Sequence, residues 1–145
     1  MYEIKRASQE VFEEIEVFLQ EVPAINDVDE AVLKNASVLF LDNKISGIIS
    51  FESFYNYALI RYFVFKRNTD VTAIKELFES IEERIRNNEI EYVFSLINQD
   101  EIYDLFLSFG FSEVDKDDVF LEEQNFLKTK FKDSKLMMKK IRNYI

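Results

Sequence analysis

The stretch that decides the fold is Ser95–Phe111, which reads SLINQDEIYDLFLSFGF. Its first three residues complete the apolar run Tyr92 to Ile97, which predicts a short buried strand. Asn98 is a favoured helix N-cap residue, and Glu101 stands three positions later, as in a capping box. Apolar residues then recur at helical spacing as far as Gly110, which predicts a helix that ends in a left-handed glycine. The stretch therefore predicts a strand, a short helix and a further strand in close succession.

The sequence on either side of this stretch predicts a mixed α/β chain. Strands are expected at Tyr2 to Arg6, Ser37 to Leu41, Ile45 to Phe54, Ala58 to Phe65, Tyr92 to Ile97, Phe111 to Val114 and Leu136 to Ile141. Helices are expected from Ser8 to a stop at Pro23, after Asp27 or Asp29, from Val71 to Asn87-Asn88, from Asn98 to Gly110 and over Val119 to Phe131. Asp42-Asn43-Lys44 is the expected turn of a hairpin. This order fits one mixed sheet of about seven strands with helices on both faces.

Composition limits the possible functions. A chain of 145 residues is the size of one domain, so we expect residues 1–145 to form a single domain. It has no cysteine and no histidine, which excludes thiol nucleophiles, zinc fingers and imidazole catalysts, and no metal site is expected. A net charge of −10 disfavours nucleic acids and anionic membranes as partners, although a local basic patch could still bind an anion. With neither a signal-peptide pattern nor a long apolar segment, a cytoplasmic protein is expected.

The element order, together with Ser95–Phe111, resembles the GNAT N-acetyltransferase superfamily. In that family a strand ends at Asn, a helix follows, and the helix closes with Leu-Tyr-x-x-x-Gly-Phe; here the closing stretch is Leu105–Phe111, LFLSFGF. Gly47 and Gly110 both fall where the family often has glycine. The resemblance covers Tyr2 to about Val114, and Leu136–Lys139 is similar to the family's last strand.

The resemblance implies an acetyl-CoA site between the fourth and fifth strands. In the family a loop of the form Arg/Gln-x-x-Gly-x-Gly/Ala wraps the pyrophosphate at a helix N-terminus. Here the matching stretch is Thr69–Ile74, TDVTAI, a degenerate version in which Thr72 and Ile74 are expected to crowd the phosphates. A carboxylate such as Asp70 about 4 Å from a phosphate would cost ~4 kcal/mol at an effective dielectric constant of 20, although Lys66 and Arg67 could compensate. The implied cofactor-binding residues are Phe63, Val64, Phe65, Thr72, Ala73, Ile74 and Asn98, the last of which is alternatively a plain N-cap.

The sequence indicates the catalytic residues less directly than the cofactor-binding residues. Phe106 stands at the position of the family's tyrosine acid, so Tyr103, one turn earlier on the same helix face, is the candidate acid; its alternative is an aromatic residue packed on the sheet. Glu52 lies beside aromatic residues and is the candidate base if that wall raises its pKa, or else a solvated strand-end residue. Arg61 could bind an acyl or carboxylate group, or pair with a structural acid.

Two functions remain open on the sequence. The first is an acyl-CoA-dependent N-acyltransferase that uses acetyl-CoA and transfers the acyl group directly to a small-molecule or peptide amine. The alternative is a catalytically inactive GNAT-fold binding or interaction module that no longer binds acetyl-CoA in the usual way. The aromatic run from Phe51 to Tyr62 would then be a homodimer or ligand surface, or simply core.

Overall fold

The computed structural model describes residues 1–22, 28–54, 56–97, 99–115, 120–121, 124–125 and 135–141. The helices are η1 (Gln9–Val11, a 3-10 turn), α1 (Phe12–Gln20), α2 (Glu30–Leu33), α3 (Val71–Asn87) and α4 (Asp100–Ser108). The strands of the main sheet are β1 (Tyr2–Arg6), β2 (Ser37–Leu41), β3 (Lys44–Ser53), β4 (Tyr57–Phe65), β5 (Tyr92–Ile97), β6 (Ser112–Glu113) and β9 (Lys135–Lys140).

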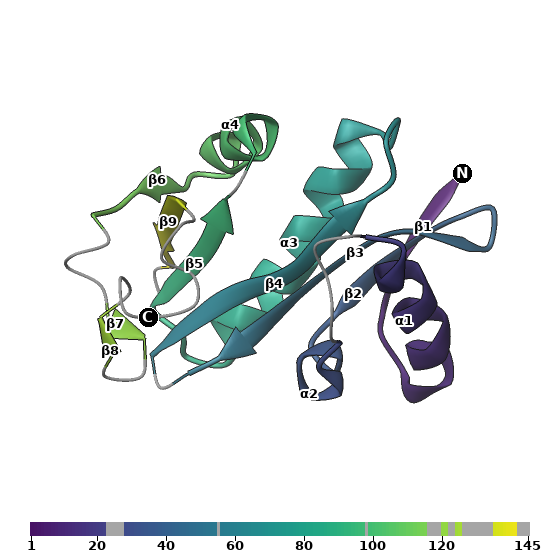
Figure 1. Ribbon diagram of the computed structural model, residues 1–145, viewed down its shortest axis with the longest axis horizontal. Coiled ribbons are helices and arrows are strands. Elements are labelled where there is room, and N and C mark those ends of the chain that lie inside the picture. Colours follow the sequence, from purple (N-terminus) through teal and green to yellow (C-terminus); the bar gives the residue numbers. More distant parts are fainter. Residues whose placement is uncertain are drawn as a thin grey trace. The chain divides into compact units, whose positions relative to one another are not determined.

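These strands form one seven-stranded sheet in the order β1-β2-β3-β4-β5-β9-β6 (Figure 1). The expected mixed α/β sheet is therefore confirmed. The chain divides into two compact units, the first made of Met1–Glu52 and Ile60–Asn88 and the second of Ser53–Leu59 and Glu89–Ile145. The single-domain expectation stays a prediction. Within the described ranges, every helix is too short or too polar to cross a membrane.

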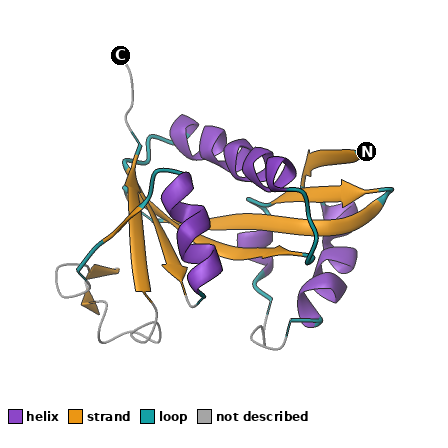
Figure 2. Ribbon diagram, turned by 90° about the horizontal axis from the view of Figure 1, so that it is seen from above, coloured by secondary structure: helices purple, strands orange, loops and turns teal. Residues whose placement is uncertain are grey.

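In the first unit, β1, β2 and β3 form an antiparallel ladder that pairs Ile4 with Leu39 and Val38 with Ile48. Asp42 and Asn43 both adopt positive φ angles, 51° and 68°, as a two-residue type I′ hairpin turn requires. The helices α1 and α2 cover one face of this part of the sheet, and α3 covers the opposite face (Figure 2). The first unit is thus a three-layer arrangement with an apolar core on both sides of the sheet.

The two helical layers of the first unit are held by regular apolar stripes. Under α1 and α2 the buried cluster consists of Ile15, Phe18, Leu19, Leu33, Ala36, Val38, Ile45 and Ile48. The inward face of α3 carries Ala73, Ile74, Leu77, Phe78, Ile81, Glu82 and Ile85. This spacing of three and four residues is what the sequence predicted for α3, and it explains the long straight helix.

The guanidinium of Arg84 links α3 to the segment that follows α2. The Nη1 atom of Arg84 donates to the backbone carbonyl of Asn35 at 2.8 Å and of Ala36 at 3.3 Å, and its Nη2 atom donates to the hydroxyl of Ser37. These carbonyls belong to the turn that follows α2. Burial, with a smaller contribution from the charge of Arg6, lowers the pKa of Arg84. Arg84 of α3 therefore binds the turn that follows α2.

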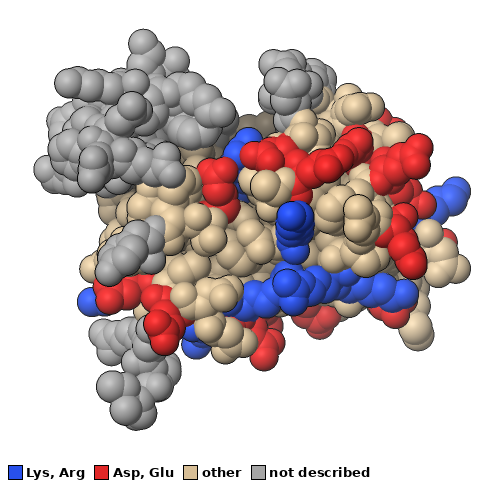
Figure 3. All heavy atoms as spheres, turned by 90° about the horizontal axis from the view of Figure 1, so that it is seen from below, with Lys and Arg blue, Asp and Glu red and all other residues tan. Residues whose placement is uncertain are grey.

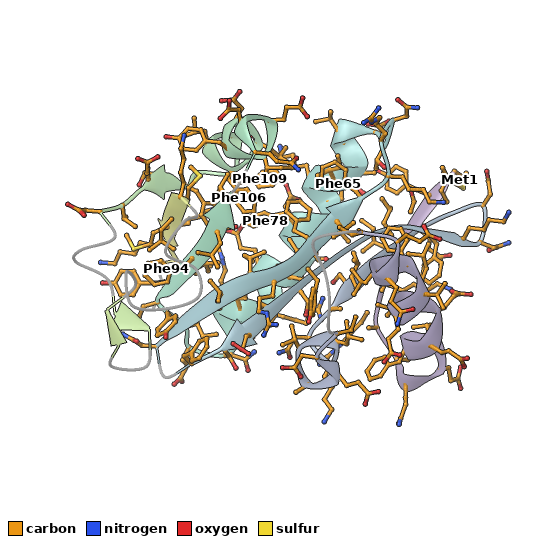
Figure 4. The ribbon with its side chains drawn as sticks, viewed as in Figure 1. Met1, Phe65, Phe78, Phe94, Phe106 and Phe109 are labelled. Carbon is orange, nitrogen blue, oxygen red and sulfur yellow. The ribbon has the colours of Figure 1, made fainter. Side chains whose placement is uncertain are left out.

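In the second unit, β5 and β9 pair antiparallel, with Phe94 opposite Met138, and β6 adds two residues on the other side of β9. Helix α4 ends as predicted: Gly110 has φ 96°, its N–H donates to the carbonyl of Leu107, and the N–H of Phe111 donates to that of Phe106, each at 3.0 Å. This is a Schellman motif. The ring of Phe106 packs edge-on against Phe111 at 4.8 Å and against Phe109 at 5.7 Å (Figure 4).

Two local predictions are wrong. Within the helix expected over Val119 to Phe131, the described residues form β7 (Phe120–Leu121) and β8 (Gln124–Asn125), a two-stranded antiparallel ladder, and the rest of that range lies outside the described residues. A short run of apolar residues fits a strand as well as a helix, so the spacing of these residues could not distinguish the two structures. The N-cap of α4 is Gln99, in an extended conformation, so the capping box drawn from Asn98 and Glu101 is out of register. Pro23, Asp27 and Asn98 lie outside the described residues.

Candidate functional site

The backbone of the central strand β4 is irregular at Tyr62. Its φ angle is 64°, in the left-handed region, although the residue lies inside a strand. Alternate residues of a regular strand point to opposite faces. Here, however, Tyr62 packs against the cluster under α1 and α2, and the preceding Arg61 reaches Asp29 at the start of α2, on the same side. We call this irregularity the bulge at Tyr62, because a β-bulge re-aims side chains in the same way. Two consecutive polar side chains of β4 therefore face the α1–α2 layer.

These side chains form a connected polar group, which we name the Arg61 cluster: Asp29, Glu52, Arg61 and Tyr62. The hydroxyl of Tyr62 accepts a hydrogen bond from the backbone N–H of Asp29 at 2.8 Å and one from Nη2 of Arg61 at 3.4 Å. The Nη1 atom of Arg61 donates to Oε2 of Glu52 at 3.1 Å and lies 3.9 Å from Oδ2 of Asp29. The cluster contains two carboxylates and one guanidinium, so its formal charge is negative.

The left-handed tyrosine is a strained element that the cluster holds in place. A bulky residue at positive φ costs about 1–3 kcal/mol and persists only where its surroundings fix it. The hydroxyl bond to Asp29 and the packing of the ring under α1 and α2 supply that restraint. Such strain is concentrated at ligand and active sites. The sequence gives no signal for it, because tyrosine, unlike glycine or asparagine, does not favour the left-handed region.

The junction between β4 and α3 closes on itself without glycine. Asn68 takes the left-handed position, with φ 56°, and the N–H of Thr69 donates to the carbonyl of Lys66 at 3.2 Å. Asp70 is the N-cap of α3, and its Oδ1 atom accepts a hydrogen bond from the N–H of Thr72 at 2.8 Å. A carboxylate of the chain thus occupies the positive end of the helix, where a phosphate would otherwise bind.

Comparison with solved structures decides the fold. The acetyltransferase of the GNAT family from Staphylococcus aureus Mu50 superposes with a TM-score of 0.76 at 15% identity, over 98% of this chain and 100% of its own. The fold is that of the GNAT acetyltransferases. No protein-family model matches the sequence, and no curated protein matches it either.

Two further GNAT-fold structures contain coenzyme A. A Mycobacterium tuberculosis protein in complex with CoA has a TM-score of 0.76 at 14% identity, over 97% of this chain and 99% of its own. N-acetylglutamate synthase from Neisseria gonorrhoeae, complexed with coenzyme A and N-acetyl-glutamate, has a TM-score of 0.75 at 16% identity. The match covers 98% of this chain but 35% of the synthase, so the chain spans about a third of that enzyme.

The cofactor residues inferred from the GNAT resemblance fall on two elements of the first unit. Phe63, Val64 and Phe65 lie on β4 after the bulge, and the rings of Phe63 and Phe65 are 5.4 Å apart (Figure 4). Gly47 of β3 leaves little room for a side chain beside them, because a Cβ atom there would lie 3.2 Å from Cβ of Phe65 and 3.4 Å from the carbonyl of Val64. Their contact with acetyl-CoA stays a prediction.

The other three cofactor residues lie on the first turns of α3. Thr72 is exposed, whereas Ala73 and Ile74 are 1% and 4% exposed. The side chain of Ile74 belongs to the buried stripe of the helix, and Asp70 supplies the carboxylate that caps it. The expectation that Thr72 and Ile74 crowd the phosphates stays a prediction.

Glu52 lies at the end of β3, with its side chain 33% exposed. The sequence suggested an aromatic wall around it, but the described partner of its carboxylate is the guanidinium of Arg61. Of the two alternatives for Arg61, the structure shows the one in which it pairs with acids of the chain. The catalytic role of Glu52 stays a prediction.

Tyr103 lies on α4 in the second unit, half-buried, with Nζ of Lys135 5.1 Å from its ring centroid. Phe106, at the position of the GNAT acid, is 1% exposed and packs in the core. Its burial explains why a phenylalanine is tolerated there. The role of Tyr103 as a substitute acid stays a prediction, as does that of Asn98, which lies outside the described residues.

Proposed function

We propose that this protein is an acyl-CoA-dependent N-acyltransferase that transfers an acyl group directly to an amine. The observation that carries the proposal is the bulge at Tyr62, because it places Arg61 and Tyr62 together on one face of the central strand of a GNAT fold. A strained residue in a central strand is costly without a function. The two neighbours crystallised with coenzyme A support the choice of donor.

Glu52 and Tyr103 have distinct proposed roles in this reaction. The amine nitrogen attacks the thioester carbonyl, a C–N bond forms and the C–S bond breaks. Glu52 takes the proton from the amine, directly or through water. The hydrogen bond from Nη1 of Arg61 orients the carboxylate of Glu52, and a positioned carboxylate can act as a general base. Tyr103 gives its proton to the departing thiolate. Positioning by the protein supplies much of the remaining rate enhancement.

The acceptor is proposed to be a positively charged amine, either a small molecule or a peptide. Residues 7–33 contain eight acidic residues and no lysine or arginine. In the view from below, acidic side chains gather in the upper right part, above a band of lysine and arginine side chains (Figure 3). The Arg61 cluster, which faces the α1–α2 layer, is also negative. Negative charge near the site attracts ligands of the opposite sign and raises their association rate.

An assay of thiol release from acetyl-CoA tests this function. Spermidine and a lysine-containing peptide are the acceptors, and glutamate is the anionic control. We expect turnover with the cationic amines and a fall in kcat of roughly a hundredfold in Glu52→Gln, as for loss of a general base. Glu30→Gln, on the exposed first turn of α2, is the matched control and should keep its kcat. Absence of thiol release, or an unchanged kcat in Glu52→Gln, would contradict the proposal.

The second candidate is a GNAT-fold binding module without activity. The specific observation in its favour is the self-capped helix α3, where Asp70 competes with any phosphate for the N–H of Thr72. This candidate requires that acetyl-CoA does not bind. Isothermal titration of the protein with acetyl-CoA separates the two functions, because micromolar binding supports the enzyme and absence of binding at millimolar ligand supports the module.

A further inference from the structure

A cavity of about 540 Å³ opens in the first unit, beside the junction of β4 and α3. Its walls are Met1 and Tyr2, residues of β2 and β3, the loop Lys66–Asp70 and Ala73 of α3. This volume is typical of small-molecule sites. Of the described residues proposed to contact acetyl-CoA, only Ala73 lines it. Thr69 and Asp70 of the lining also belong to the loop that the resemblance matches to the pyrophosphate loop, so the cavity adjoins the proposed donor site and extends beyond it to β1, β2 and β3.

The inner part of the cavity is apolar. Leu39 and Ala73 line it and are each 1% exposed. Leu41 lines the cavity as well, and 47% of its surface stays exposed. Met1 lines the cavity too and is also exposed. Exposed apolar side chains that gather around a cavity are typical of a ligand site, whereas isolated ones are not.

The charged residues of the cavity favour an anion. Lys66 and Arg67 are adjacent and exposed, and no described residue forms an ion pair with either of them. Asp70 accepts the N–H of Thr72 and Glu76 accepts the hydroxyl of Tyr2, so neither acid is paired with Lys66 or Arg67, and in the cavity lining the two cations outnumber the one carboxylate, that of Asp70. The cationic groups are thus available to a ligand, although the chain as a whole carries a charge of −10. A carboxylate or phosphate would find charge-assisted donors here.

We propose that this cavity binds a small organic anion with an apolar body, of the class of a medium-chain carboxylate. Its anionic head contacts Lys66 and Arg67, and its hydrocarbon body packs on Leu39, Leu41 and Ala73. Neither the anionic head nor the hydrocarbon body is sufficient by itself for tight binding. Lys66 and Arg67, which contact the head, are exposed to water, and the apolar surface that contacts the body is small. The proposal does not depend on acyl transfer, and activity is not its readout.

The test is an NMR titration of the full chain with hexanoate, hexan-1-ol and acetate. Hexanoate should shift the backbone amides of Leu39–Leu41 and Lys66–Ala73. Because both parts of the ligand are needed, its affinity should exceed that of the alcohol and of acetate by roughly tenfold or more. Equal affinity for hexan-1-ol would overturn the proposal, since no anion would then be recognised. Shifts spread evenly over the molecule would overturn it too.

Charge variants make the test specific. Lys66→Gln with Arg67→Gln should weaken hexanoate binding roughly tenfold, because each lost charged donor removes a charge-assisted bond. Lys34→Gln with Lys140→Gln removes the same charge from exposed positions outside the cavity and should leave the affinity unchanged. The spectra report at the same time that each variant is folded. Unchanged binding in the first pair, or competitive displacement of hexanoate by acetyl-CoA, would contradict a separate anion site.

Discussion

Asp70 and Thr72 are joined across the first turn of α3, where Oδ1 of Asp70 accepts the backbone N–H of Thr72 at 2.8 Å. This bond is the reason that the junction needs no bound anion to complete the helix. A phosphate at the same place would have to displace the carboxylate or bind beside it. Asp70 therefore stabilises the fold and opposes the proposed donor at the same time.

Replacing Asp70 by serine should raise the affinity for acetyl-CoA. Serine keeps a helix cap while it removes the negative charge, so binding by isothermal titration should tighten by roughly tenfold or more. Asp70→Ala should also lower the free energy of unfolding by about 1 kcal/mol, because the cap is lost. Asp42→Asn, in the exposed hairpin turn, controls for net charge. Equal affinity in Asp70→Ser and Asp42→Asn would show that the carboxylate is not the obstacle.

Loss of the Tyr62 hydroxyl should destabilise the first unit. Tyr62→Phe keeps the ring but leaves the N–H of Asp29 and Nη2 of Arg61 without this acceptor. The free energy of unfolding, measured by urea denaturation, should fall by about 1 kcal/mol. Tyr92→Phe, at a half-buried tyrosine of β5, is the matched control. If both variants lose the same stability, the hydroxyl bonds of Tyr62 contribute nothing specific.

Gly110 should tolerate asparagine better than alanine. Its φ of 96° is disfavoured for any residue with a Cβ atom, and a Cβ here would lie 3.3 Å from Cε of Lys139, which can move. Gly110→Ala should therefore cost about 1–2 kcal/mol of unfolding free energy, mainly through the backbone. Gly110→Asn should cost less, because asparagine visits the left-handed region more readily. Equal losses in thermal or urea unfolding would instead indicate a steric effect.

Because of Tyr2, the free energy of unfolding should decrease measurably at alkaline pH. Its hydrogen bond to Glu76, together with desolvation and the charges of Glu76 and Asp70, raises the pKa of Tyr2. Above about pH 10 the unfolded chain loses this proton while the folded chain retains it, so the free energy of unfolding falls as pH rises. Tyr2→Phe and Glu76→Gln should both flatten this slope. An unchanged slope in both variants would show that the bond does not persist in solution.

Much of the fold could be predicted because its signals are local. The stripe from Val71 to Ile85 gave helix α3, and Gly110 correctly marked the end of α4. The site could be predicted only in part, because its geometry depends on non-local contacts. The left-handed Tyr62 exists because Asp29 and the α1–α2 layer fix it, and these lie far from it in sequence.

The bonds from Arg84 to the turn after α2 have a consequence for local opening. Helix α2 has four residues, too few to be stable by itself. Because a side chain of α3 binds the carbonyls of Asn35 and Ala36, α2 cannot unravel without releasing that guanidinium. Amide hydrogen exchange around α2 is therefore expected to follow the sub-global opening of the last turns of α3, as one cooperative unit, and not the fast fraying of a short surface helix.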